Sequence, residues 1–219
     1  MDTMTVDKRQ LQLWADELRS IADEGLRWSA DNPYNHERYT RILHFAARLF
    51  AVQDTRAVET IDRAYHADLS HLAPYPCGDA AIIDEGGRIL LIQRQDDGLW
   101  AMPGGFLSIG ETPAEGTCRE AWEETGVEVD PLALSGIYDS RLYHDRSPFH
   151  LYQLVFLCRP RHPDRQPRVT HETLDVRWYA QSDLATLALE PGHERRIGDA
   201  FRLWRGETRA AAFDSASVG

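Results

Sequence analysis

Apolar side chains recur every three or four positions along the first third of the chain, which is the spacing of one face of an α-helix. Three such stripes follow one another, over residues 7–25, 39–50 and 57–65. Polar residues fill the positions between them, so each helix would bury one face and expose the other. The pattern predicts a small helical domain over residues 1–68.

The hydrophobic period changes after a proline-containing segment at residues 69–76, which we interpret as a linker. Short runs rich in β-branched and aromatic residues then alternate with turn residues, as expected for the strands of a second domain at residues 77–208. The runs expected to form strands are residues 79–84, 88–95, 132–141, 149–159 and 175–180. A last helix is expected at residues 192–204, and the small, polar tail at residues 209–219 is expected to be flexible.

One helix of this second domain is marked at both ends by its sequence. Thr112 is a suitable N-cap, Pro113 fits the first helical position, and Glu115 completes a capping box. Gly126 suits the left-handed position at which a helix ends. At about 100° per residue, small residues gather on one face of this helix, where they would allow close packing against a sheet.

The opposite face of this helix carries Glu120, Glu123 and Glu124 within one turn. Like charges at this spacing repel, so a cation is expected beside them. One interpretation is a solvated acidic face in which Arg119 pairs with Glu123. The other is a site for magnesium or manganese, which prefer oxygen ligands and share them with phosphate groups. Gly116 favours the second, because glycine destabilises a helix and would leave room for a ligand above the carboxylates.

Composition narrows the range of partners. The 219 residues carry a net charge of −11, which disfavours unaided attraction to nucleic acid or to an anionic membrane surface. No apolar run is long enough to span a membrane. The three cysteines, Cys77, Cys118 and Cys158, form no CxxC pair and are expected to be reduced core residues of a cytoplasmic protein.

The segment at residues 105–127, GFLSIGETPAEGTCREAWEETGV, matches the signature of the Nudix hydrolases position for position. The chain therefore resembles that family. The resemblance implies an α+β fold: a Nudix α/β/α sandwich with a mixed sheet, preceded here by the small helical domain. It also implies catalysis that depends on Mg²⁺ or Mn²⁺.

The resemblance also implies roles for residues of the motif. Glu120, Glu123 and Glu124 match the metal-binding positions, and Gly105 marks the loop that brings backbone to the metal. Arg119 matches the arginine that orients a glutamate of the helix. Glu123 and Arg119 are accordingly assigned to catalysis.

Likeness extends beyond the motif to a Nudix subgroup with an N-terminal helical domain, typified by CDP-choline pyrophosphatases. It implies hydrolysis of the pyrophosphate bond of a nucleoside diphosphate linked to another group, X, of CDP-choline or ADP-ribose type. We expect Arg94, Trp100 and Tyr143 to bind this small nucleotide substrate. The helical domain is expected to pack against a second copy in a homodimer, because so small a unit is weakly stable alone.

Activation of the attacking water needs a proton acceptor. Glu172 lies in a loop before a predicted strand and is our candidate general base, against the simpler interpretation of a solvated loop glutamate. His144, Asp145 and His171 are weaker candidates, because they lie in polar loops where such residues are common.

Other functions remain open from the sequence. ADP-ribose pyrophosphatases of the family usually carry a proline past the motif where this chain has Leu142 and Tyr143, which weakens ADP-ribose as the substrate. Dinucleoside polyphosphate hydrolases have a tyrosine near the place of Tyr143. An RNA-end-processing enzyme is disfavoured by the negative charge. A nucleotide-sensing module without catalysis is disfavoured because every carboxylate of the motif is present.

Overall fold

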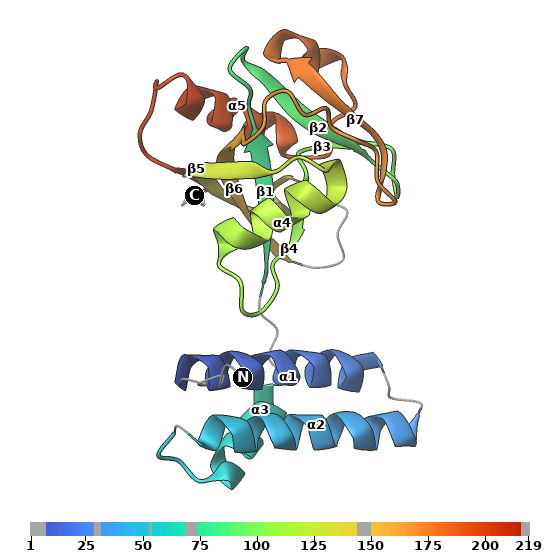
Figure 1. Ribbon diagram of the computed structural model, residues 1–219, viewed down its shortest axis with the longest axis vertical. Helices are drawn as coiled ribbons and strands as arrows, with labels where there is room; N and C mark the ends of the chain where they lie inside the picture. Colours follow the sequence, from blue (N-terminus) through green and yellow to red (C-terminus); the bar gives the residue numbers. More distant parts are fainter. Residues whose placement is uncertain (1–7, 29–31, 53, 69–73, 144–149, 216–219) are drawn as a thin grey trace, which may run out of the picture. The chain divides into compact units, whose positions relative to one another are not determined.

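The computed structural model describes residues 8–28, 32–52, 54–68, 74–143 and 150–215. The chain divides into two compact units, Met1–Leu72 and Ala73–Gly219. Figure 1 shows a helical first unit and a second unit in which helices flank β-sheet. Within the described residues, no helix is both long and apolar enough to cross a membrane.

Helices form the first unit: α1 (Lys8–Trp28), α2 (Pro33–Ala51) and α3 (Val58–Asp68). Asn32 starts α2, since its side-chain oxygen accepts hydrogen bonds from the backbone N–H groups of Tyr34 and Asn35 at 3.1 and 3.2 Å. The predicted apolar stripes meet in a small core: Ala22, Leu43, Ala46, Ala47, Ile61 and Tyr65. Large apolar side chains stay outside it, and Trp28 and Phe45 are 82% and 54% exposed.

The boundary of the predicted linker needs correction. Strand β1 begins at Tyr75, so the last two of residues 69–76 belong to a strand. Pro76 lacks an N–H group but uses its carbonyl, which accepts a hydrogen bond of 3.2 Å from the backbone N–H of Leu107. Residues 69–73 lie outside the described part of the chain.

The second unit contains a mixed β-structure. Its strands are β1 (Tyr75–Ile82), β2 (Arg88–Arg94), β3 (Trp100–Ala101), β4 (Gly104–Phe106), β5 (Val129–Asp139), β6 (Leu151–Pro160), β7 (Thr173–Ala180) and β8 (Ala212–Phe213). They pair in the orders β4-β1-β6-β5-β8 and β3-β2-β7. The pairs β1–β6 and β5–β8 are parallel and the other ladders are antiparallel, which confirms the predicted mixed sheet.

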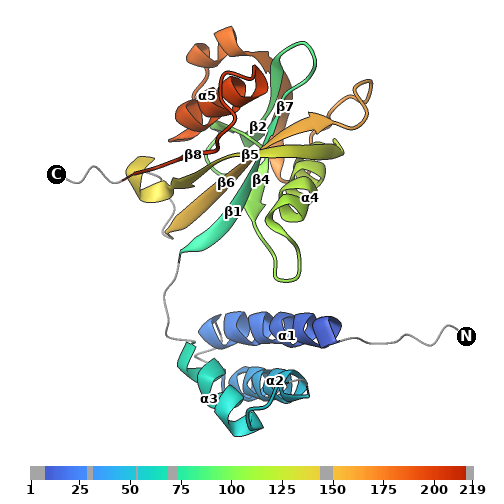
Figure 2. The same ribbon diagram turned by 90° about the vertical axis from the view of Figure 1, so that its left-hand side faces the viewer.

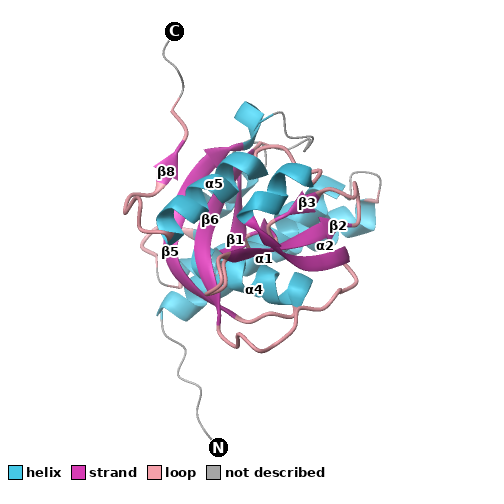
Figure 3. Cartoon of the chain, turned by 90° about the horizontal axis from the view of Figure 1, so that it is seen from above, coloured by secondary structure: helices cyan, strands magenta, loops and turns pink. Residues whose placement is uncertain are grey.

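Two longer helices cover opposite faces of this β-structure, α4 (Pro113–Thr125) and α5 (His193–Trp204) (Figure 2). Alternate residues of β1 face the two helices: Ala80 is buried in one cluster with Ala121 of α4, and Ala81 in another with Phe201 of α5. Seen from above, α5 lies across β5 and β6 (Figure 3). The predicted α/β/α sandwich is therefore confirmed.

The tail that we expected to be flexible contains a strand. Ala212 and Phe213 form β8, which pairs in parallel with β5. The carboxylate of Asp214 then accepts hydrogen bonds from the backbone N–H of Asp139 and from the hydroxyl of Tyr143. Small and polar residues 209–215 thus become ordered by long-range pairing, which local composition does not reveal. Residues 216–219 lie outside the described chain.

Candidate active site

Helix α4 has the ends that its sequence predicts. The hydroxyl of Thr112 accepts from the N–H of Glu115 at 3.3 Å, and the Glu115 carboxylate accepts from the N–H of Thr112 at 2.8 Å. Gly126 ends the helix in the left-handed conformation, with φ of 69°. Thr117 and Ala121 are fully buried against the sheet. This packing turns the carboxylate face of α4 toward the loop around β4.

Arg119 connects the carboxylates of this region. Its NH1 nitrogen donates to Glu120 at 2.8 Å and to Glu123 at 3.0 Å. Its Nε and NH2 nitrogens donate to the two oxygens of Glu111, and NH2 also donates to the backbone carbonyl of Phe106 at 3.2 Å. The guanidinium thereby fixes the helix to the loop that precedes it.

Gly116 has a different role from the one expected. A Cβ atom at this position would lie 2.5 Å from a carboxylate oxygen of Glu111 and 2.7 Å from a methyl group of Leu107. The space above Gly116 is therefore filled by the chain itself and not left for a ligand. The glycine admits Glu111, which then binds Arg119. Sequence reasoning assigned no role to Glu111, although the residue belongs to the motif.

Glu120 and Glu124 lie against a glycine-rich loop. The carboxylate of Glu124 accepts a hydrogen bond of 2.8 Å from the backbone N–H of Gly104. A Cβ on Gly105 would come within 2.9 Å of the Glu120 carboxylate, so the glycine leaves room for the carboxylate in this position. The backbone of β4 thus passes directly over two carboxylates of α4.

These two carboxylates are held in an environment that disfavours their charge. Burial, with the nearby charges of Glu120, Glu172 and Asp79, raises the pKa of Glu124 to about 8, although the N–H of Gly104 opposes the shift. Burial also raises the pKa of Glu120, with Glu123 and Glu172 adding to the effect and Arg119 opposing it. A cation would relieve this repulsion.

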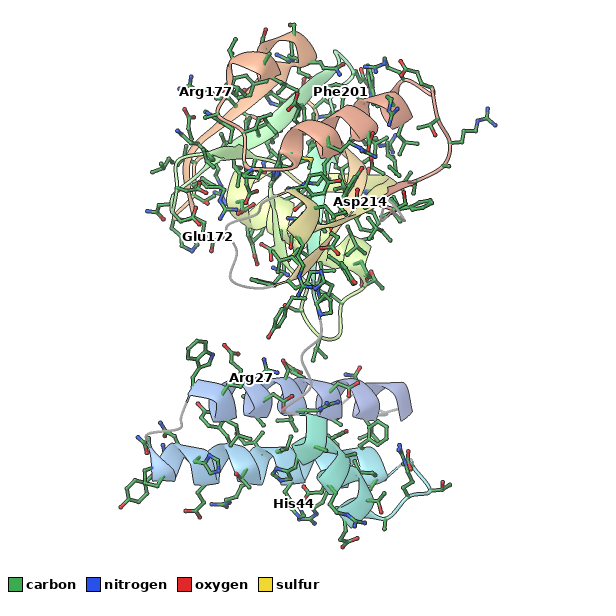
Figure 4. The ribbon with its side chains drawn as sticks, turned by 180° about the vertical axis from the view of Figure 1, so that it is seen from behind. Arg27, His44, Glu172, Arg177, Phe201 and Asp214 are labelled. Atoms are coloured by element: carbon green, nitrogen blue, oxygen red, sulfur yellow. The ribbon has the colours of Figure 1, made fainter. Side chains whose placement is uncertain are left out.

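A cleft with a volume of about 680 Å³ opens beside β4 and Glu124. Glu172 and Arg94 line it, so the structure brings both predicted residues to the same cavity as the motif. Glu172 is exposed at the edge of the unit (Figure 4). Its side chain lies 3.1 Å from the imidazole of His171, which is 85% exposed. His144 and Asp145 lie outside the described residues.

Two residues expected to bind substrate do not line this cleft. Trp100 is 9% exposed and packs edge-to-face on Tyr179 in the core on the α5 side. The side chain of Trp100 stabilises this core, because its large apolar area is buried there. Tyr143 lies at the end of a 3₁₀ turn, where its hydroxyl donates to Asp214.

A chain of ion pairs along the cleft was missed from the sequence. Arg196 donates to Asp79 at 2.6 Å and lies 3.1 Å from the Nδ1 nitrogen of His193. Glu190 lies 3.1 Å from the same nitrogen and accepts from Arg94 at 2.6 Å. The chain joins residues of β1 and β2 to residues around the start of α5, and the only local signal is the charged first turn of α5, His193 to Arg196.

The donor chemistry of the site suits a hard divalent cation. Glu120, Glu123 and Glu124 supply carboxylate oxygens, and Gly105 brings backbone alongside them. Within the described part of the chain, no three acidic, histidine or cysteine side chains are close enough to hold a metal ion as they stand. Arg119 and the backbone N–H of Gly104 bind the carboxylates that a metal would use.

Comparison with known proteins identifies a family for each of the two units. Residues 78–200 match the NUDIX domain family, and residues 9–65 match the UDP-X-like, N-terminal oligomerisation domain. A putative ADP-ribose pyrophosphatase of Bacillus subtilis is 28% identical over 91% of this chain and 95% of its own length. An ADP-ribose pyrophosphatase of Methanocaldococcus jannaschii is 33% identical over 57% of this chain and 72% of its own length.

Solved structures show the same fold. The crystal structure of a UDP-X diphosphatase aligns with a TM-score of 0.57 and 21% identity over 95% of this chain and all of the other. The match of residues 9–65 to the UDP-X-like, N-terminal oligomerisation domain confirms the predicted Nudix subgroup with an N-terminal helical domain. With the motif helix, its glycine loop and the mixed sheet all present, the chain belongs to the NUDIX hydrolase family.

Proposed function

We propose that the protein hydrolyses the pyrophosphate bond of a nucleoside diphosphate linked to a second group, of the ADP-ribose or CDP-choline type, by attack of water at phosphorus. The observation that carries the proposal is the approach of Gly104 and Gly105 to the half-buried carboxylates of Glu124 and Glu120, beside a cleft large enough for a nucleotide. The chain has a net charge of −11, so a polyphosphate needs charge compensation at this place.

The proposed cofactor is Mg²⁺ or Mn²⁺, held by Glu120, Glu123 and Glu124 with backbone at Gly105. Bound there, it would neutralise phosphate charge and lower the pKa of the attacking water. Arg119 keeps the glutamates of the helix in place. Glu172 lines the same cleft, and its carboxylate is proposed to accept the proton of the attacking water.

Two observations bear on the group X. The relative from B. subtilis, similar along almost its full length, is named as a putative ADP-ribose pyrophosphatase, which favours ADP-ribose. The absence of the expected proline near Leu142 weakens that choice. ADP-ribose and CDP-choline therefore remain the first two substrates to compare.

We also propose that the first unit forms a homodimer. The similarity of residues 9–65 to an oligomerisation domain supports self-association, and the exposed side chains of Trp28, Tyr34 and Phe45 offer apolar surface for it. A two-fold symmetric pair is the commonest closed arrangement for such a surface.

The test is a substrate screen with the full chain. ADP-ribose, CDP-choline, dinucleoside polyphosphates and 5′-triphosphorylated RNA are each incubated with Mg²⁺ or Mn²⁺, and products are separated by chromatography. We expect a nucleoside monophosphate from ADP-ribose or CDP-choline, no reaction after chelation, and recovery when metal is added back. A protein that binds these nucleotides but cleaves none would be a sensing module, and preferential cleavage of RNA would replace the proposed substrate class.

A further inference from the structure

The carboxylate of Asp214 joins the C-terminal segment to two places in the second unit. Its Oδ2 oxygen accepts a hydrogen bond of 2.9 Å from the backbone N–H of Asp139, at the end of β5. Its Oδ1 oxygen accepts a hydrogen bond from the hydroxyl of Tyr143, at the end of the 3₁₀ turn Ser140–Tyr143. Asp214 does not line the cleft, but each of its two partners leads to a segment that does.

The first connection runs through Tyr143 to the start of α5. A Cβ atom on Gly192 would lie 2.9 Å from Cγ and 3.0 Å from Cβ of Tyr143, so the tyrosine is in close contact with the backbone there. Gly192 is the N-cap of α5, and its neighbours Pro191 and His193 both line the cleft. Tyr143 therefore packs against a segment of the cleft wall from a position outside the cleft.

The contact with Tyr143 matters because Gly192 has little to restrain it. Its φ of 85° is left-handed, and glycine has wider backbone freedom than any other residue. Arg196 holds the same segment by donating a hydrogen bond of 3.0 Å to the carbonyl of Pro191. Without the packing of Tyr143, hydrogen bonds alone would fix this part of the wall.

The second connection runs through the end of β5 to the start of β6. The N–H of Asp139 is bound by Asp214, and the Asp139 carboxylate lies 2.8 Å from the Nε2 nitrogen of His150. The hydroxyl of Ser140 accepts a hydrogen bond of 3.0 Å from the backbone N–H of Leu151. Leu151 is buried and lines the cleft. One carboxylate thus reaches two separate segments of the cleft wall.

The proton between Tyr143 and Asp214 stays on the tyrosine. Burial, with the hydrogen bond and the charge of Asp214, raises the pKa of Tyr143 to about 12. The hydroxyl is therefore protonated at physiological pH and donates to a charged acceptor. Hydrogen bonds of this kind are roughly twice as strong as neutral ones, so this one restrains the tyrosine ring.

We propose that Asp214 is a positioning residue for the cleft. Acting through Tyr143 and through the end of β5, it holds Leu151 and the segment at residues 191–193 in the arrangement that binds substrate. The inference deepens the proposed function and rests on it only in taking this cleft as the substrate site. Neither connection includes a carboxylate of α4, so we expect Asp214 to affect substrate binding more than the chemical step.

Hydrogen exchange of the full chain tests the connection without catalysis. Asp214→Ala removes the carboxylate, and Tyr143→Phe keeps the ring but removes its hydroxyl. In both variants, amide exchange should become at least about threefold faster in peptides that cover residues 190–193 and stay unchanged in those that cover α4, because local opening reflects local contacts. Unchanged exchange at residues 190–193, or faster exchange throughout the second unit, would overturn the assignment.

Steady-state kinetics with the best substrate of the screen test the effect on binding. Asp214→Ala should raise KM about tenfold and change kcat less than about threefold, because an interaction that is equal in the ground state and the transition state appears in KM. The double variant with Tyr143→Phe should be no worse than Asp214→Ala alone, since the two residues share one hydrogen bond. Additive effects would show that they act separately and would overturn the proposed connection.

Asp84→Ala is the matched control. Asp84 lies in the turn between β1 and β2, and its carboxylate likewise accepts hydrogen bonds from a backbone N–H and from a side chain, both of Arg88. It does not line the cleft. Asp84→Ala should therefore leave KM and the exchange at residues 190–193 unchanged. An equal rise in KM would mean that loss of any hydrogen-bonded aspartate has this effect, which would overturn the role of Asp214.

The outcomes separate this inference from the proposed function. A wild-type protein that hydrolyses no linked nucleoside diphosphate would overturn the proposed reaction, while faster exchange confined to the cleft wall in both variants would still support the connection from Asp214. Hydrolysis by the wild type, with an unchanged KM in Asp214→Ala, would leave the proposed function in place and overturn the positioning role.

Discussion

Arg119 binds Glu111 through two hydrogen bonds, from Nε at 3.0 Å and from NH2 at 2.8 Å. The pairing fixes the plane of the guanidinium, so that its NH1 nitrogen is directed at Glu120 and Glu123. Glu111 accepts a further hydrogen bond from the backbone N–H of Ser108, which ties the loop before the helix to the same arginine. Glu111, which does not line the cleft, thereby sets the direction of the arginine that binds Glu120 and Glu123.

Arg119→Lys should lower turnover by about 10²-fold, because a lysine lacks the planar set of donors and a small misplacement of the carboxylates is costly in catalysis. Arg177→Lys is the matched control, since Arg177 is exposed and pairs with Asp175 away from the site. Steady-state rates with the best substrate measure the effect. Equal rates in the two variants would show that the arginine does not position the site.

Glu124→Gln and Glu123→Gln should each reduce turnover by about 10² to 10⁴-fold while leaving the fold intact, as expected for loss of a positioned charged group. Glu85→Gln, in an exposed turn, serves as the control. Turnover is measured at saturating Mg²⁺, and circular dichroism verifies the fold. Wild-type turnover in both variants would contradict the metal-binding assignment.

Glu172→Gln should reduce turnover by about 10²-fold or more and change the dependence of rate on pH, with little effect on metal affinity. The reason is that the amide cannot accept the proton of the attacking water. Glu194→Gln, exposed on α5, is the control. If Glu172→Gln retains both its rate and its pH profile, Glu172 is a bystander and Glu123 becomes the next candidate base.

Full-length protein should be a dimer at micromolar concentration, measured by light scattering. Deletion of residues 1–70 should give a monomer or an aggregate, because the first unit supplies the apolar surface for association. A monomeric full-length protein at that concentration would refute the proposed homodimer.

Asp199→Asn should lower the free energy of unfolding at neutral pH by about 1–3 kcal/mol. Burial alone would raise the pKa of Asp199, but hydrogen bonds from Arg195, Tyr138 and Arg202 outweigh it and lower the pKa. The folded pKa is thus below the unfolded value of about 3.9, so the stabilisation is present above that pH and is lost as pH falls through the folded pKa.

Chemical denaturation of wild type and Asp199→Asn between pH 3 and pH 8 checks this. The difference in free energy should be constant above about pH 5 and shrink below about pH 4. Asp183→Asn, in an exposed turn, should show little difference at any pH. A difference that stays constant down to acid pH would mean that the charge of Asp199 contributes nothing.

Features set by neighbouring residues were predictable from the sequence. Helix α4 was predicted with the correct cap at Thr112 and end at Gly126, because both depend on contacts within a few residues. The final helix was predicted for the same reason. The roles of Glu123, Glu172 and Arg119 in catalysis stay predictions.

Features set by distant residues were not predictable. Gly116 was expected to leave room for a ligand. That prediction was wrong because Glu111, five residues earlier, fills the space, and its position depends on the fold of the loop. Trp100 next to the motif was expected at the substrate, yet a large apolar side chain is more stable against Tyr179 in the core. Strand β8 and the chain from Asp79 to His193 bring together segments that no local pattern connects.

Strand β8 also has a protective consequence. It pairs with Gly136 and Ile137 of β5 at the edge of the sheet, where backbone N–H and C=O groups would otherwise be free to pair with another molecule. Unpaired edge strands promote aggregation. Proteolysis ahead of Ala212 would therefore expose this part of β5 and favour aggregation, and an affinity tag is better fused to the other terminus.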